Sequence, residues 1–185
     1  MLIVIHGTGA AGYTWWHFNS SFSTYLDQVT GGDLYKNQDQ FSWTGGRRDS
    51  HRQTAADKLV DWLQAHPATY YTIVAHSHGG NVAMLATRKG AKIDRLILLG
   101  TPIRTDYTPD LRNVGLIYNV FSTKDLFQIG GVVPYSRGEG RTLGDSEKLV
   151  NVLVHRGHLP PPLNVHSLLH DENLWRAFNL DQLLL

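Results

Sequence analysis

Short runs of continuously apolar residues recur along this chain and are separated by segments long enough to form helices. A strand with one face in water alternates apolar and polar residues, whereas a strand buried on both faces of a parallel sheet is apolar throughout. The pattern therefore predicts a mainly parallel sheet that is covered on both sides. Five segments fit it, 2–5, 71–75, 96–99, 114–121 and 149–154, and 40–43 is a weaker strand candidate.

Amphipathic segments lie between these runs and predict helices over 54–65, 82–87 and 166–180. Strands that alternate with helices indicate an α/β fold with right-handed crossovers. The segments 101–113 and 126–147 contain several Pro or Gly residues, and we expect both to be loops that follow strands. Ligands of open parallel sheets bind at the carboxyl ends of strands, so these loops are expected to border the functional site.

Composition narrows the function classes. The length of 185 residues predicts a single domain over 1–185. With 17 basic and 16 acidic side chains the net charge is +1, and we expect no nucleic-acid partner. The chain has no Cys, which excludes disulfides, thiolate metal sites and a Cys nucleophile.

No apolar run approaches the roughly 20 residues that cross a bilayer, so we expect no transmembrane segment. The first five residues are too short and too uncharged for a secretory signal. We expect a cytoplasmic protein, and an exported form whose signal has been removed is the alternative. The oligomeric state stays open.

The segment from Tyr71 to Gly80 carries the strongest functional signal. A β-branched strand runs into a turn of small residues with Ser77 at its tip, and a helix is expected directly after. This order is similar to the nucleophile elbow Gly-x-Ser-x-Gly, with Ala75 at the first small position. The alternative is that Ser77 only caps the following helix.

A Gly-rich segment, His6-Gly7-Thr8-Gly9, follows the first predicted strand. Such a loop can turn a backbone N–H toward a reacting carbonyl and form an oxyanion hole. The alternatives are a tight turn and a phosphate or dinucleotide loop. The dinucleotide reading needs an acidic residue after a second strand, and no convincing strand precedes Asp33.

These features together resemble the α/β-hydrolase superfamily, in particular small bacterial lipases and esterases with an Ala-His-Ser-x-Gly-Gly elbow. The resemblance covers nearly the whole chain and also includes the segments 121–125 and 166–169. It implies a minimal α/β-hydrolase fold with about six strands. Only about fifteen residues separate the fourth and fifth predicted strands, too few for a large cap domain.

The resemblance further implies a catalytic triad in the chain order Ser77, Asp125, His166. It implies that the backbone N–H groups of Thr8 and His78 form the oxyanion hole. The reaction would then be the hydrolysis of a carboxylic ester through an acyl-enzyme. No cofactor is expected.

Several positions leave alternatives open. Asp106 and Asp110 are rivals of Asp125 as the acid, and His158 is the runner-up to His166 as the base. We expect His170 to lie on a helix surface. It is four residues after His166, but no carboxylate or Cys cluster completes a metal site, so no metal is expected. His76 and His78 are interpreted as spacers in the elbow.

Substrate contacts are harder to predict. Trp15 and Phe127 are candidates for an acyl pocket, and core packing is the alternative. Arg47, Arg48 and Arg52 could meet a carboxylate or phosphate, although a solvated helix entry is the favoured reading. The expected substrate is a small-molecule or lipid ester. A thioesterase, a phospholipase and a catalytically silent binding module of the same fold are the alternatives.

Overall fold

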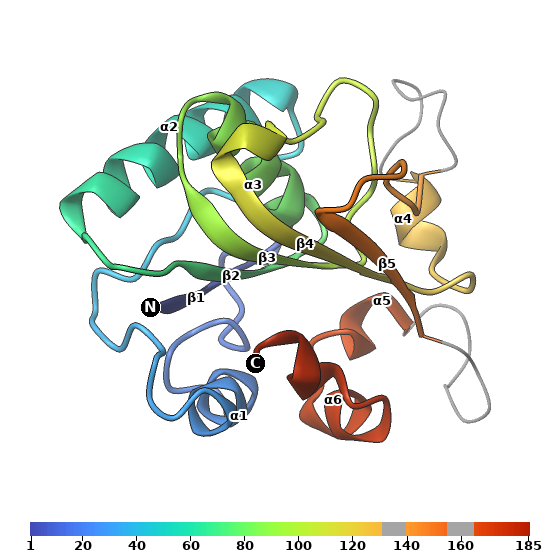
Figure 1. Ribbon diagram of the computed structural model, residues 1–185, viewed down its shortest axis with the longest axis horizontal. Helices are drawn as coiled ribbons and strands as arrows, with labels where there is room; N and C mark the ends of the chain where they lie inside the picture. The colour runs from blue at the N-terminus through green and yellow to red at the C-terminus, as the bar shows by residue number, and fades with distance from the viewer. Residues whose placement is uncertain (131–139, 155–164) are drawn as a thin grey trace.

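The computed structural model describes residues 1–130, 140–154 and 165–185. Its centre is a sheet of parallel strands whose order in space follows their order in the chain (Figure 1). The strands are β1 (Leu2–Ile5), β2 (Thr72–His76), β3 (Ile93–Leu99), β4 (Val114–Phe121) and β5 (Leu149–Leu153). The expectation of an α/β fold with a parallel sheet is confirmed.

Helices cover both faces of this sheet (Figure 1). Along the chain they are α1 (Ser21–Val29), α2 (Asp49–Ala65), α3 (His78–Arg88), α4 (Leu126–Gly130), α5 (Val165–Leu168) and α6 (Glu172–Ala177). Two short 3₁₀ turns, η1 (Leu111–Asn113) and η2 (Leu180–Leu183), complete the described part. α2 and α3 lie on one face, whereas α1, α5 and α6 lie on the other.

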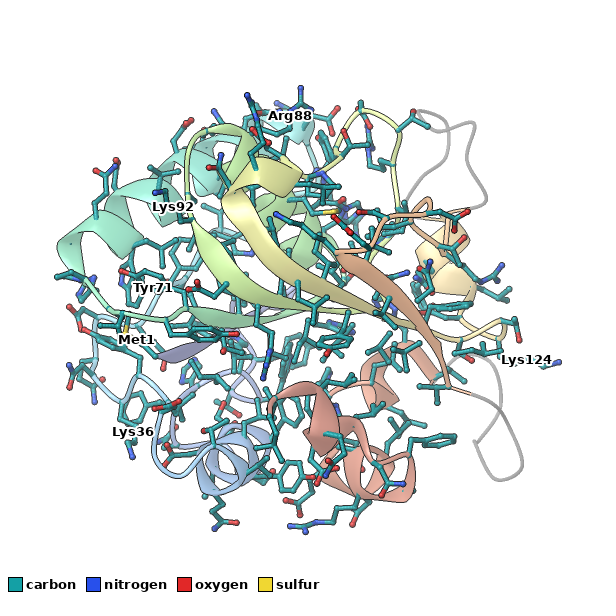
Figure 2. The ribbon with its side chains drawn as sticks, viewed as in Figure 1. Met1, Lys36, Tyr71, Arg88, Lys92 and Lys124 are labelled. Atoms are coloured by element: carbon teal, nitrogen blue, oxygen red, sulfur yellow. The ribbon has the colours of Figure 1, made fainter. Side chains whose placement is uncertain are left out.

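The continuously apolar strands follow from this layering. Successive side chains of a strand point to opposite faces, and here each face has its own core. Ile73 and Ala75 of β2 pack toward the α2–α3 side, and Val74 between them packs toward α1 and α6. Every residue of β1 and β2 is buried. Charged side chains such as Lys36 and Arg88 point outward (Figure 2).

The strand predicted over 40–43 is wrong, and the described residues hold five strands where about six were expected. The place beside β1 is taken by Leu34, which forms an isolated parallel bridge with Leu2. Phe41 and Trp43 are buried, but they pack over the core without joining the sheet. Two apolar side chains within four residues do not distinguish a strand from a buried loop.

The long C-terminal helix predicted over 166–180 is divided into α5 and α6. The Asp171 side chain accepts hydrogen bonds from the N–H groups of Asn173 and Leu174 and so starts a new helix at Glu172. α2 and α3 begin earlier than expected, at Asp49 and His78. α4 lies inside a segment expected to be a loop, of which residues 131–139 fall outside the described part.

α1 was not expected from the sequence. It begins after Ser20, whose hydroxyl accepts a hydrogen bond from the N–H of Ser23 and so caps the first turn. Its buried side chains Phe22 and Leu26 are four residues apart and therefore lie on one face. Among the described helices, none combines the length and the apolar character needed to cross a membrane.

Candidate active site

Ser77 occupies a strained turn between β2 and α3. Its backbone has φ 54° and ψ −134°, a conformation that residues other than Gly rarely adopt. Its side chain makes no capping hydrogen bond to α3, so the alternative reading of Ser77 as a helix cap is wrong. Strain of this kind persists only where the surroundings enforce it, and it concentrates at functional sites.

The glycines around this turn leave no room for larger residues. A Cβ on Gly79 would lie 2.5 Å from the carbonyl oxygen of His6, and one on Gly80 would lie 2.1 Å from Thr101 Oγ1. A Cβ on Gly7 would meet Ser77 Cβ at 2.6 Å. The first turn of α3 can therefore pack against the ends of β1 and β3 only because Gly79 and Gly80 carry no side chain.

Asp125 and His166, which lie 41 positions apart, form a hydrogen bond. The Nδ1 of His166 is 2.7 Å from Oδ2 of Asp125. The Asp125 side chain is fully buried, and its other oxygen accepts a hydrogen bond from the backbone N–H of Gln128 at 3.1 Å. Gly100 makes space for the pair, because a Cβ there would lie 2.9 Å from Asp125 Oδ2.

The rival acids have other partners. Asp106 accepts two hydrogen bonds from the guanidinium of Arg104, which hold the pKa of that carboxyl below its ordinary value. Asp110 is bonded to Arg112 and caps η1. Neither lines the cleft at Ser77. His158, the rival base, lies outside the described residues.

Ser77 and His166 line the same cleft, which has a volume of about 1220 Å³ and lies at the carboxyl ends of the strands. Thr8 and His78 line it as well. Among the described residues, the backbone N–H groups of Thr8 and His78 donate to no protein acceptor. Both amides are therefore open to a ligand in the cleft.

The segment 43–45 braces the loop that carries Thr8. Trp43 Nε1 donates to the carbonyl oxygen of His6 at 2.8 Å, and Gly9 N donates to Gly45 O at 2.8 Å. The Gly-rich loop does not open a helix, because α1 begins only at Ser21. This geometry does not fit a dinucleotide loop, whose glycines lead directly into a helix.

The ring of His76 lies beside those of His166 and His170, and sequence reasoning missed this cluster of histidines. The Nε2 of His76 is 2.9 Å from the carbonyl oxygen of His166. His170 was expected on a helix surface, but it lines the cleft and stacks on Trp15 at 3.8 Å between ring centroids. Burial lowers the pKa of His170 to about 4. The expectation failed because α5 ends at Leu168, so His170 lies in the turn before α6 and not on a helix surface.

Buried histidines in this cluster are held neutral at physiological pH. Burial, together with the neighbouring His166 and His170, keeps the pKa of His76 well below its ordinary value. On the other side of Ser77, burial and the positive charges of Arg52 and Arg104 lower the pKa of His78 to about 3. Neither residue is a mere spacer, since both line the cleft.

The two residues predicted to contact substrate both line the cleft. Phe127 is 53% exposed and its ring centroid lies 5.4 Å from that of His166. Trp15 is half-buried between His76 and His170. An exposed aromatic ring beside His166 is available to an apolar ligand.

The three arginines at positions 47, 48 and 52 lie in different surroundings. Arg47 and Arg52 line the cleft, whereas Arg48 is exposed at the start of α2. Arg52 is only 3% exposed, so the expectation of a solvated helix entry is wrong for this residue. Its guanidinium is bonded to Asp49, to the carbonyl oxygen of Arg47 and to the hydroxyl of Tyr107.

No protein-family model matches the chain, and no curated protein matches it. Solved structures do match. A protein from Xanthomonas campestris pv. campestris, assigned to the alpha/beta superfamily of hydrolases, aligns with a TM-score of 0.58 and 18% identity over 99% of this chain and 96% of that one. Lipase B from Aspergillus fumigatus aligns with a TM-score of 0.54 and 16% identity over 83% of this chain and 44% of that one.

A third match is the thioesterase RedJ from the prodiginine biosynthetic pathway in Streptomyces coelicolor. It has a TM-score of 0.51 and 17% identity, with 97% of this chain and 89% of that chain covered. Together with the parallel sheet and its flanking helices, these similarities show that the chain has the α/β-hydrolase fold. The fold class expected from the sequence is confirmed.

Proposed function

We propose that this protein is a serine hydrolase that cleaves carboxylic esters, with Ser77 as nucleophile, His166 as base and Asp125 as acid. The observation that carries the proposal is the 2.7 Å bond from His166 to the buried Asp125, in the same cleft where Ser77 sits at the tip of a strained strand–helix turn. A triad is recognised by such geometry and roles and not by sequence position.

The reaction follows from the chemistry of these groups. A serine hydroxyl is a weak nucleophile at neutral pH, so His166 accepts its proton through Nε2 as Oγ attacks the acyl carbonyl. Asp125 holds the imidazole in the tautomer that carries its proton on Nδ1, and it stabilises the imidazolium that forms. The imidazolium then gives its proton to the leaving alkoxide, and water releases the acid in a second, similar cycle.

The N–H groups of Thr8 and His78 are proposed to stabilise the tetrahedral oxyanion. Their support is that both residues line the cleft beside Ser77 and that the loop carrying Thr8 is braced by Trp43. Fixed donors of this kind are worth about 10²–10³ in rate each, because they need no reorganisation as the charge develops.

The triad also serves thioesters and phospholipids, so a thioesterase and a phospholipase stay alternatives within the same chemistry. One structural neighbour is a lipase and another a thioesterase. A catalytically silent binding module is the alternative from another class. Its expected signature is a triad member without its partner.

The test combines covalent labelling with hydrolysis of 4-nitrophenyl esters from acetate to palmitate and of matched thioesters. We expect a fluorophosphonate to label wild type and not Ser77→Ala, and we expect Ser77→Ala and His166→Ala to lose activity. Retained activity in His166→Ala with loss in His158→Ala would move the base to His158. If the folded wild type shows neither labelling nor activity, the proposed hydrolase function is wrong and the binding module is the function that the fold supports.

A further inference from the structure

The cleft has two chemically different sides, and the residues before and after Ser77 define them. His76 faces an aromatic side, where its ring lies 4.5 Å from that of His166, 4.9 Å from His170 and 5.4 Å from Trp15 between centroids. His78, the residue after Ser77, lines the cleft together with Arg52 and Arg104, whose positive charges act on its imidazole. A substrate that spans Ser77 therefore meets aromatic rings at one end and guanidinium groups at the other.

Arginines line the other part of the cleft, and hydrogen bonds within the protein hold two of them in fixed positions. Arg47, Arg52 and Arg104 all line the cleft, and the described lining residues include no Asp or Glu. Arg52 and Arg104 are each only 3% exposed. Hydrogen bonds to Tyr107 and to a backbone carbonyl hold Arg52, and two hydrogen bonds to Asp106 hold Arg104. Both guanidinium groups are thus fixed in place.

The balance of charge on this side is positive. The carboxylates of Asp49 and Asp106, each about half-exposed, compensate Arg52 and Arg104. In the described part of the chain, the Arg47 guanidinium is exposed and pairs with no carboxylate. A cleft with walls of one sign raises the local concentration of ligands of the opposite sign.

The direction of catalysis assigns the two sides to the two parts of an ester. The leaving oxygen must receive its proton from His166, so the leaving group lies on the aromatic side with Trp15 and Phe127. The acyl part then extends past His78 toward the arginines. Arginine is suited to this task because its planar fork matches the geometry of a carboxylate.

We propose, on the basis of the proposed function, that the substrate is the half-ester of a dicarboxylic acid, whose free carboxylate at the far end of the acyl chain is bound by Arg47. Water adds across the ester bond, the leaving oxygen takes a proton as the alcohol, and the acyl carbon becomes the second carboxylate. Arg52 and Arg104 are paired with Asp49 and Asp106, so Arg47 makes the contact that selects the substrate.

The test compares ethyl half-esters of straight-chain dicarboxylic acids, from succinate to sebacate, with the isosteric ethyl esters that end in an amide. We expect kcat/KM to favour the carboxylate by about ten-fold or more at its best chain length, as for hydrogen bonds to charged groups. The preference should shrink with added salt, since the contact is at an exposed guanidinium.

Two variants at neighbouring arginines give the matched control. Arg47→Gln should reduce the preference for the carboxylate over the amide to near unity, and Arg47→Lys should keep part of it. Arg48→Gln removes an equal charge one residue away, at a position that does not line the cleft, and should keep the full preference.

Three outcomes would overturn the proposal. One is equal rates for the carboxylate and amide esters, and another is a preference that survives Arg47→Gln. The third uses two butyrate esters, one of glycolate and one of glycolamide, which place the carboxylate or the amide on the leaving group. A preference for the glycolate ester would show that the anion is bound on the leaving-group side. In each case hydrolysis of the neutral esters continues. Loss of hydrolysis of every ester, with no labelling of Ser77, instead contradicts the proposed function itself.

Discussion

The Nε2 of His76 lies 2.9 Å from the backbone carbonyl oxygen of His166. A carbonyl can only accept, so the imidazole donates and its Nδ1, which is buried without a partner among the described residues, carries no proton. His76, which directly precedes Ser77, thereby holds the backbone of His166, whose ring bonds Asp125. The strand that leads to Ser77 and the helix α5 that carries His166 are coupled through one side chain.

This coupling makes His76 a positioning residue whose hydrogen bond can be tested. His76→Phe removes the donor and leaves the carbonyl of His166 unpaired, so we expect kcat to fall by about ten-fold or more, as small displacements of reacting groups cost rate steeply. His76→Gln keeps a donor and should stay within a few-fold of wild type. The measurements are kcat and its pH profile on a 4-nitrophenyl ester. Equal losses in both variants would show that the ring, not the donor, matters.

Gly100 is the second position where a single atom should disturb the site. Gly100→Ala places a Cβ 2.9 Å from Asp125 Oδ2 and 3.1 Å from His166 Nδ1, at φ 58°. Because it pushes the pair apart, we expect kcat to fall by about 10²-fold. Gly31→Ala is the control, since Gly31 has a similar φ of 70° with open space around it. It should lose about 1 kcal/mol of stability through backbone strain and keep its activity. Normal activity in Gly100→Ala would show that the pair tolerates displacement.

Stability should fall on mild acidification because buried histidines must take up protons. The pKa of His170 is about 4 in the folded chain against 6.5 for the free group. The unfolded chain therefore binds more protons between these values, and the free energy of unfolding decreases as the pH falls from 6.5 toward 4. His170 alone should contribute about 2 kcal/mol between pH 7 and pH 5.

Urea unfolding at several pH values measures this dependence. His170→Phe keeps the ring beside Trp15 and removes the titrating nitrogen, so its free energy of unfolding should depend less on pH than that of wild type. His76 and His78 remain in that variant, and a part of the slope should remain with them. An unchanged slope would mean that His170 is protonated in the folded chain at pH 5.

Phe127 offers a change that affects substrate without affecting the core. Its ring is 53% exposed beside His166, so Phe127→Ala should change the free energy of unfolding by about 0.5 kcal/mol or less. We expect kcat/KM to fall for esters with long or aromatic leaving groups and to change little for methyl esters. Val150→Ala, at an exposed position that does not line the cleft, is the control. A uniform loss over all esters would point to a role in positioning His166.

The sequence by itself determined the local elements that depend on neighbouring residues. The apolar strands and the turn at Ser77 could be read from periodicity and from the small residues that a tight strand–helix turn requires. The strand expected at 40–43 failed because burial alone, without a partner, does not make a strand. The division of the last helix at Asp171 was missed, although an Asp before a helix is a capping signal.

Only the tertiary structure decided which distant side chains meet. The bond between Asp125 and His166 depends on the space left by Gly100, a residue that belongs to neither segment. The stacking of His170 on Trp15 and the burial of Arg52 likewise depend on how helices pack over two faces of the sheet. Contacts across such separations are set by packing in three dimensions, which no periodicity along the chain encodes.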